Sequence, residues 1–195
     1  MTQSEILALF KETHALLDGH FQLTSGLHSP QYFQCARVLQ FPKNAERVCA
    51  EIASRFRSES VDVVAAPALG GIVVGQEVAR QLGARSIFAE RSEGKLQLRR
   101  GFEIGKGERV LVCEDVITTG DSVRELIDLV SRYNGKLMGV GVIVDRSGAR
   151  VIFPNFYALV TLLVTTYQPD HCPLCEEGIP VEKPGSRKAI QKETL

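Results

Sequence analysis

Two adjacent carboxylates, Glu114 and Asp115, end an apolar stretch and precede the hydroxyl-rich loop 118–122. Ligands of open parallel sheets bind beyond the carboxyl ends of the strands. Backbone N–H groups at the start of a helix form an anion site, especially where small residues allow close approach. The loop could therefore hold a phosphate, and the carboxylates could accept hydrogen bonds from vicinal hydroxyls. This pattern predicts a site for a ribose 5-phosphate.

A simpler interpretation of the same stretch is a solvated strand end followed by an ordinary helix N-cap. That interpretation suits any one of these residues, but it does not explain the whole order of residue types over 110–123. The other common phosphate loops, G-x-x-x-x-G-K-[ST] and G-x-G-x-x-G, are absent from the sequence. The phosphate-and-diol interpretation is therefore favoured.

The elements around this stretch alternate between strand and helix. Short apolar runs predict strands at 61–66, 86–89, 110–113, 138–144 and, at an edge, 157–164. Helical spacing of apolar residues predicts helices at 4–17, after Pro42, at 72–82 and at 121–133. Two extended segments within 20–36 predict a hairpin. The alternation predicts an α/β fold with a parallel sheet and right-handed crossovers.

One connection is unusually long. Residues 91–107 are polar, basic and glycine-containing and show no period, and loops of this length often act as lids. The pair Arg99-Arg100 lies in this stretch, where a basic pair beside a phosphate site favours a function over a merely solvated face.

Composition narrows the class of partner. The 195 residues carry 23 basic and 23 acidic side chains, so the excess of positive charge that nucleic-acid binders need is missing. The first twenty residues do not resemble a signal peptide, and no apolar run is long enough to cross a bilayer. The five cysteines are expected to be free thiols. We expect a cytoplasmic protein that binds neither nucleic acid nor membrane.

The stretch 110–123 resembles the PRPP motif of the type I phosphoribosyltransferases, where PRPP is 5-phosphoribosyl-1-diphosphate. Further motifs are similar to those of the orotate-specific branch of that family, and together they extend the resemblance over about residues 18–166. These motifs are Phe21-x-Leu-Thr-Ser-Gly26, Ser29-Pro-x-Tyr32-Phe33, Pro67-Ala-Leu-Gly-Gly71-Ile, Glu90-Arg91 and Val144-Asp145-Arg146.

The resemblance implies the type I phosphoribosyltransferase fold, with helices on both faces of the sheet. It implies one domain over 1–167, with a small N-terminal hood at about 1–40 and a mobile lid at about 92–102. Residues 168–195 would form a C-terminal tail. It also implies a homodimer in which the lid closes over the neighbouring subunit's site.

The reaction implied is transfer of the phosphoribosyl group from PRPP to orotate, giving orotidine 5'-phosphate and diphosphate in de novo pyrimidine biosynthesis. Mg²⁺ would be the cofactor, held by the substrate rather than by direct protein ligands. Two alternatives stay open at this point. One is a phosphoribosyltransferase for another base, and the other is a non-enzymatic PRPP-sensing regulator that binds nucleic acid.

The resemblance also implies roles for individual residues. Glu114 and Asp115 would bind the ribose hydroxyls. Arg146 would pair with the orotate carboxylate, which a guanidinium can bind in bidentate fashion. The remaining catalytic candidates are cations of the lid: Lys95, Arg99 and Arg100. PRPP would further contact Arg91, Lys95, Ala68, Leu69, Gly70, Gly71, Val116, Ile117, Thr118, Thr119, Gly120, Asp121 and Ser122. Orotate would contact Tyr32, Phe33 and Thr118 in addition to Arg146.

Several positions depart from the family pattern. Many relatives have a lysine where this chain has Thr24 and another where it has Gly70. The lid also lacks one lysine and a histidine of the usual motif. Lys95, Arg99 and Arg100 could supply the positive charge that the missing side chains carry in relatives.

The C-terminal C-x-x-C offers a different chemistry. His171, Cys172 and Cys175 could contribute to a zinc site, but one such pair supplies too few ligands for a tetrahedral site unless a dimer adds a second. The sequence favours a turn with two free thiols. Cys113 lies on a predicted buried strand and is expected in the core.

Overall fold

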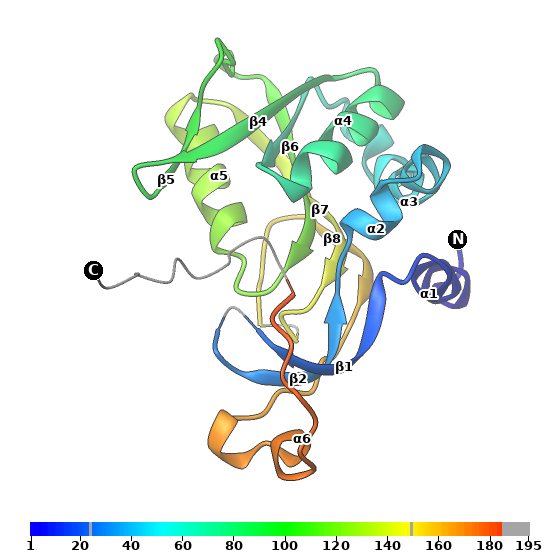
Figure 1. Ribbon diagram of the computed structural model, residues 1–195. Helices are drawn as coiled ribbons and strands as arrows, with labels where there is room; N and C mark the ends of the chain where they lie inside the picture. The colour runs from blue at the N-terminus through cyan, green and yellow to red at the C-terminus, as the bar shows by residue number, and fades with distance from the viewer. Residues whose placement is uncertain (24, 149, 185–195) are drawn as a thin grey trace. The chain divides into compact units, whose positions relative to one another are not determined.

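The computed structural model describes residues 1–23, 25–148 and 150–184, and the chain forms two compact units (Figure 1). The larger unit comprises Met1–Ala15 and Gln34–Leu163. The smaller unit comprises Leu16–Phe33 and Val164–Leu195. Thr24 and the end of the predicted tail, 185–195, lie outside the described residues.

The larger unit is built on a six-stranded sheet with the order β5-β4-β3-β6-β7-β8. Neighbouring strands are parallel except for the pair β4 and β5, which is antiparallel. The strands are β3 Val63–Pro67, β4 Arg85–Ser92, β5 Lys95–Leu98, β6 Arg109–Ile117, β7 Lys136–Asp145 and β8 Phe156–Thr161. This arrangement confirms the predicted α/β class, and every predicted strand is present.

Helices cover both faces of this sheet. The helices that pack on its strands are α3 Pro42–Phe56, α4 Gly70–Leu82 and α5 Asp121–Arg132. The same unit also contains α1 Gln3–Glu12 and α2 Ala36–Leu39. Val63 and Ala65 of β3 pack in the cluster that contains the buried face of α5, whereas the next residue, Ala66, lies against Gly75 of α4. Because side chains alternate along a strand, α4 and α5 cover opposite faces. Within the described ranges, none of the helices is long and apolar enough to span a membrane.

The first helix is shorter than its apolar spacing predicts. Helix α1 begins with a capping box between Thr2 and Glu5 and ends at Glu12, because His14 takes a left-handed conformation with φ 51°. Leu16, expected on the helix, instead pairs with Phe33 in the smaller unit. The prediction of a helix to residue 17 was wrong because strand pairing overrode a local helical pattern.

The long connection 91–107 is partly ordered as a hairpin. Strand β4 runs on to Ser92, and Ser92 pairs with Lys95 of β5 across a turn at Glu93 and Gly94. Both turn residues have positive φ, as a two-residue hairpin turn requires. The expectation of a loop without regular structure was therefore wrong for its first half.

The smaller unit contains the predicted hairpin, formed by β1 Leu16–Gln22 and β2 His28–Phe33. Two segments from the C-terminal part of the chain extend it, since Tyr167 pairs with His28 and Glu182 pairs with Phe21. Between these two residues lie a 3₁₀ turn at Pro169–His171 and the short helix α6 Pro173–Glu176.

Candidate active site

The carboxyl ends of β3 and β6 form the point where the strand order reverses. These two strands are neighbours, yet α4 leads from β3 to β4 on one side while α5 leads from β6 to β7 on the other. Ligands of open α/β sheets bind in the crevice outside such a reversal point. The sequence motif at the end of β6 therefore lies where this fold favours a ligand.

Glu114 and Asp115 lie near the end of β6 with restricted access to solvent. Glu114 is only 8% exposed and Asp115 is half-buried. The Asp115 backbone N–H donates to Glu114 Oε1 at 3.1 Å. Loss of solvation raises the pKa of both carboxyl groups, and the neighbouring Asp115 charge raises the pKa of Glu114 further. A ligand that donates hydrogen bonds or carries positive charge would lower the cost of keeping both groups ionised.

The start of α4 packs directly on these carboxylates. A Cβ on Gly70 would lie 2.4 Å from Asp115 Oδ2, and a Cβ on Gly71 would lie 2.9 Å from Glu114 Oε1. Only glycine fits at these distances, so no side chain separates the backbone of α4 from the acidic pair. The absence of a lysine at Gly70 thus has a steric reason in this structure. Just before the helix, the Ala68–Leu69 peptide is cis and Leu69 is 82% exposed.

The loop after β6 leads into α5 with its amides available to an anion. Thr118 and Thr119 are exposed, and no side chain caps the helix at Gly120. Gly120 has φ 77°, and a Cβ there would lie 2.9 Å from Phe153. Glycine is therefore required both for its conformation and for space. The N–H groups of the first turn of α5 lack acceptors within the helix, as anion binding requires.

Arg124 fixes the shape of this loop. Its Nη1 donates to the Thr119 carbonyl oxygen at 2.7 Å and to Asp121 Oδ1 at 2.9 Å. Thr119 Oγ1 also donates to Asp121 Oδ2 at 2.8 Å. Sequence reasoning missed Arg124, although its i,i+3 spacing from Asp121 on a predicted helix was a usable signal.

Arg146 is brought next to the loop by the pairing of β6 with β7. Ile117 pairs with Asp145, and the backbone N–H of Arg146 donates to the Ile117 carbonyl oxygen at 2.9 Å. The half-buried Arg146 therefore follows directly on the strand end beside the carboxylate strand. Two motifs separated by some thirty residues in sequence meet at one edge of the sheet.

The lid cations lie on or after the β4–β5 hairpin. Arg91 binds Glu125 of α5, with Nη2 2.8 Å from Oε1, and Arg100 binds Glu90, with Nε 2.8 Å from Oε2. The positive charge of Arg99 helps to lower the pKa of Glu90. Lys95 and Arg99 are exposed. The ion pairs of Arg91 and Arg100 are thus with Glu125 and Glu90, not with the acidic pair at the end of β6.

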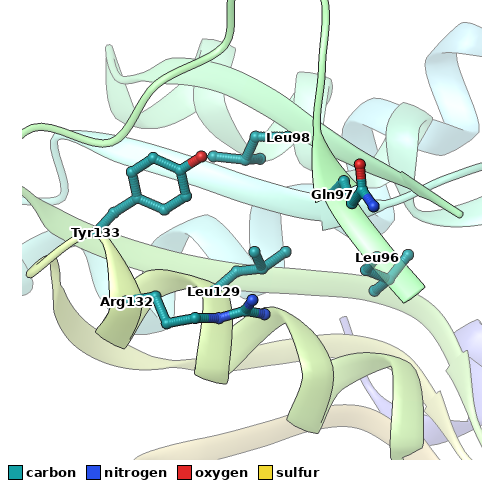
Figure 2. A pocket seen from close by; sticks show the side chains of 6 residues that line it. All are labelled: Leu96, Gln97, Leu98, Leu129, Arg132 and Tyr133. Carbon is teal, nitrogen blue, oxygen red and sulfur yellow. The ribbon is translucent and has the colours of Figure 1, made fainter. Parts of the chain in front are cut away.

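A separate pocket lies between β5 and the C-terminal half of α5 (Figure 2). None of the predicted site residues lines it. Its lining residues are Leu96, Gln97, Leu98, Leu129, Arg132 and Tyr133.

Tyr32 and Phe33 belong to the smaller unit. Phe33 is buried, as expected for one member of an adjacent aromatic pair in a strand. Tyr32 is half-buried, and its ring lies 5.7 Å from that of Phe21, centroid to centroid. Tyr32 is thus the member of the pair with an accessible surface.

Cys35 is a buried thiol of the larger unit that sequence reasoning did not single out. Burial raises its pKa, and the nearby charges of Asp115 and Glu114 add to that effect. The thiol therefore stays protonated close to the acidic pair. No pattern in the sequence indicated this proximity.

Comparison with known proteins agrees with this geometry. Residues 38–171 match the phosphoribosyl transferase domain family. The orotate phosphoribosyltransferase of Caldicellulosiruptor bescii is 54% identical over 96% of this chain and all of its own length. That of Pelotomaculum thermopropionicum is 56% identical over the same shares. The chain belongs to the orotate phosphoribosyltransferase family.

A solved orotate phosphoribosyltransferase has a similar fold. The crystal structure from Aeropyrum pernix matches 80% of this chain and 93% of its own, with a TM-score of 0.67 and 25% identity. The predicted type I phosphoribosyltransferase fold is confirmed.

Proposed function

We propose that this chain transfers the phosphoribosyl group of PRPP to orotate, releasing diphosphate. The observation that carries the proposal is the packing of Gly70 and Gly71 on Asp115 and Glu114, at the point where the strand order reverses. The backbone at the start of α4 thus lies against the carboxylates, and the loop 118–122 follows them at the end of β6. Such a site suits diphosphate, ribose and 5-phosphate in that order. The match to orotate phosphoribosyltransferases along nearly the whole chain supports orotate as the acceptor.

The reaction breaks the anomeric C–O bond of PRPP and forms a C–N bond to the base, with inversion. Positive charge develops on the ribosyl group as the diphosphate leaves. Glu114 and Asp115 would accept hydrogen bonds from the ribose hydroxyls and offset that charge. Restricted access to solvent strengthens such an interaction because the carboxylates are already oriented and little water must reorganise. Orotate enters as an anion, so no strong general base is needed.

The loop 118–122 would bind the 5-phosphate through the first-turn amides of α5 and the hydroxyls of Thr118, Thr119 and Ser122. The Arg124 contacts to Thr119 and Asp121 support this role because they hold the loop in one shape without occupying its amides. The backbone at Ala68–Gly71 would face the diphosphate. These residues lie at the N-terminus of α4, where the partial positive charge of the helix dipole stabilises an anion.

Mg²⁺ fits the chemistry of this site. The hard carboxylate oxygens of Glu114 and Asp115 suit Mg²⁺, and a cation would counter the rise in the pKa of both groups that burial causes. We propose that the substrate's diphosphate and hydroxyl oxygens hold the ion. When bound, Mg²⁺ would supply charge neutralisation for the leaving group.

The acceptor base would be selected by Arg146, which lies beside Ile117 at the same sheet edge. A guanidinium can bind the orotate carboxylate with two parallel hydrogen bonds, and neither adenine nor uracil offers that group. Of the two aromatic residues that the sequence suggested, Tyr32 would contact the pyrimidine, because Phe33 is buried. A phosphoribosyltransferase for another base is the alternative, and substrate comparison separates the two.

The β4–β5 hairpin and the residues to 102 would act as the lid. Arg91 and Arg100 pair with Glu125 and Glu90, and exposed ion pairs of this kind contribute little stability, so they can be exchanged for substrate phosphate. We propose that lid closure excludes water and takes place across a homodimer. A cytoplasmic location is supported by five free thiols.

The test is the loss of orotate absorbance in purified protein with PRPP and Mg²⁺. Consumption should require all three components, and Asp115→Asn should lower the rate by about 10²-fold, the usual effect of removing one oriented electrostatic group. Adenine and uracil should not be consumed. Binding of PRPP without any consumption of orotate would contradict the orotate assignment and favour another acceptor.

A further inference from the structure

Four side chains capable of binding a metal converge within the smaller unit. His20 lies on β1, His28 on β2, Cys172 directly precedes α6, and Cys175 lies on α6 (Figure 1). One ligand atom from each of the four lies within 4.8 Å of all the others. His20, His28 and Cys172 are buried, and Cys175 is exposed. We propose that these four residues form a structural zinc site.

The separations match the edges of a tetrahedron around zinc. Zn–S bonds of about 2.3 Å and Zn–N bonds of about 2.0–2.1 Å place ligand atoms about 3.3–3.8 Å apart. Cys172 Sγ lies 3.5 Å from His20 Nε2, and Cys175 Sγ lies 3.8 Å from the same atom. Cys175 Sγ lies 3.4 Å from His28 Nδ1. The two imidazole nitrogens are 2.9 Å apart, closer than the tetrahedral separation, so one ring would move outward by a few tenths of an ångström on binding zinc.

The outer contacts also suit a metal ligand. His20 Nδ1 lies 2.7 Å from the Ile179 carbonyl oxygen, which can only accept a hydrogen bond. Nδ1 must therefore carry a proton, which leaves Nε2, on the side of the two sulfurs and His28, as the nitrogen that would bind a metal. Zinc-bound histidines commonly donate their second ring N–H to a carbonyl in this way. The Cys175 N–H donates to the Cys172 carbonyl oxygen at 3.0 Å, which holds both thiols on one side of the turn.

Charge and ligand type favour zinc over the cation of the proposed reaction. Two thiolates and two neutral imidazoles balance the double charge of Zn²⁺, so burying the complete site carries no net charge. Sulfur and imidazole ligands select Zn²⁺, whereas Mg²⁺ prefers oxygen. The simpler alternative is a hydrogen-bonded histidine pair beside two free thiols. It accounts for the contact between His20 and His28, but not for two sulfurs that both lie against His20 Nε2.

The smaller unit also has a structural need for such a link. Among its described residues, the buried apolar side chains are Phe21, Phe33 and Cys172. Units this small usually need disulfides, metals or association to be stable. Zinc would join the β1–β2 hairpin to a segment some 150 positions later in the chain, beside the bridges of His28 to Tyr167 and Phe21 to Glu182.

The ligand set differs from the one that the sequence suggested. His171 neighbours Cys172 in the chain, but it is exposed and is not a member of the four. The two histidines come instead from the N-terminal hairpin. No dimer is needed to complete the set.

The experiment measures zinc in the full-length protein, loaded with Zn²⁺ alone and then desalted. We expect about one zinc per chain, as a closed four-ligand site holds its metal tightly. Cys175→Ser should lower the zinc content severalfold. His171→Asn, a change at an exposed neighbour of the ligands, should leave it unchanged. Circular dichroism of each variant separates loss of metal from loss of the fold.

A second measurement uses the wild-type chain, so it does not depend on the folding of a variant. With Co²⁺ in place of Zn²⁺, a site with two sulfur ligands should show intense visible bands and a thiolate-to-metal absorption. Substoichiometric zinc after loading, equal zinc in Cys175→Ser and wild type, or weak octahedral cobalt bands would each overturn the proposal. An intact mass lower by two hydrogens would identify a disulfide instead. None of these readouts depends on the proposed enzymatic activity.

Discussion

Replacing Gly70 by alanine tests whether close packing on the acidic pair creates the active site. The added Cβ would lie 2.4 Å from Asp115 Oδ2 and 2.6 Å from its Cγ and Oδ1. Atoms in proteins do not approach this closely, so the carboxylate or the start of α4 must move by at least about 0.6 Å. Asp115 is half-buried on β6 and has little room to turn away.

The expected cost is larger for catalysis than for folding. Overpacking of one methyl group typically costs about 1–3 kcal/mol of stability. A displacement approaching 1 Å at a reacting centre can lower the rate by about 10²-fold. Gly70→Ala should therefore lower kcat/KM for PRPP by about 10- to 100-fold while the protein remains folded at the assay temperature.

The assay is steady-state kinetics with PRPP varied at saturating orotate, together with thermal unfolding. Gly75→Ala is the matched control because its Cβ would meet Ala66 Cβ at 2.9 Å, on the same helix but away from the carboxylates. It should lower Tm while leaving kcat/KM within about twofold. The reasoning fails if Gly70→Ala keeps the wild-type kcat/KM, or if both variants lose activity equally.

Three further predictions concern residues around the same sheet edge. Arg146→Lys should raise KM for orotate by about tenfold, with KM for PRPP little changed, because a bidentate charged contact is lost. Burial raises the folded-state pKa of Glu114 and Asp115, so the stability they contribute is present at low pH and lost as pH rises through that pKa. Glu114→Gln should accordingly raise Tm by about 2–4 °C at pH 8, and the Tm difference between variant and wild type should shrink on acidification. The same Tm difference at pH 8 and at acidic pH would argue against a buried charge on Glu114. Glu125→Ala removes the acceptor of the Leu96 N–H and of Arg91, so amide exchange at Leu96 should speed up by about fivefold; unchanged exchange would mean that Glu125 does not hold the hairpin.

Local patterns in the sequence were sufficient for the core of the fold. The predicted strand runs that became β3, β6 and β7 are apolar on successive residues because these strands are largely buried on both faces, so their character is visible without a partner. Helices α3, α4 and α5 begin within two residues of the expected positions, since proline, glycine and acidic residues mark their ends locally.

Patterns failed where distant segments decided the structure. Leu16 was predicted in a helix because its spacing fits one, but pairing with Phe33 placed it in β1. The segment 95–98 alternates polar and apolar residues, but four positions inside a long polar stretch did not stand out, and it becomes β5 because it pairs with the end of β4. Pairing energy depends on a partner that a local window does not contain.

The same division applies to the sites. The sequence by itself was enough to single out the acidic pair, the loop 118–122 and Arg146 as candidate site residues, because residue type and adjacency indicate their chemistry. Only the tertiary structure brought Gly70 onto Asp115, and only it joined His20 and His28 to the C-terminal cysteines. These contacts link residues that are far apart in the chain, and such distances are fixed by the packing of the whole fold rather than by any local preference.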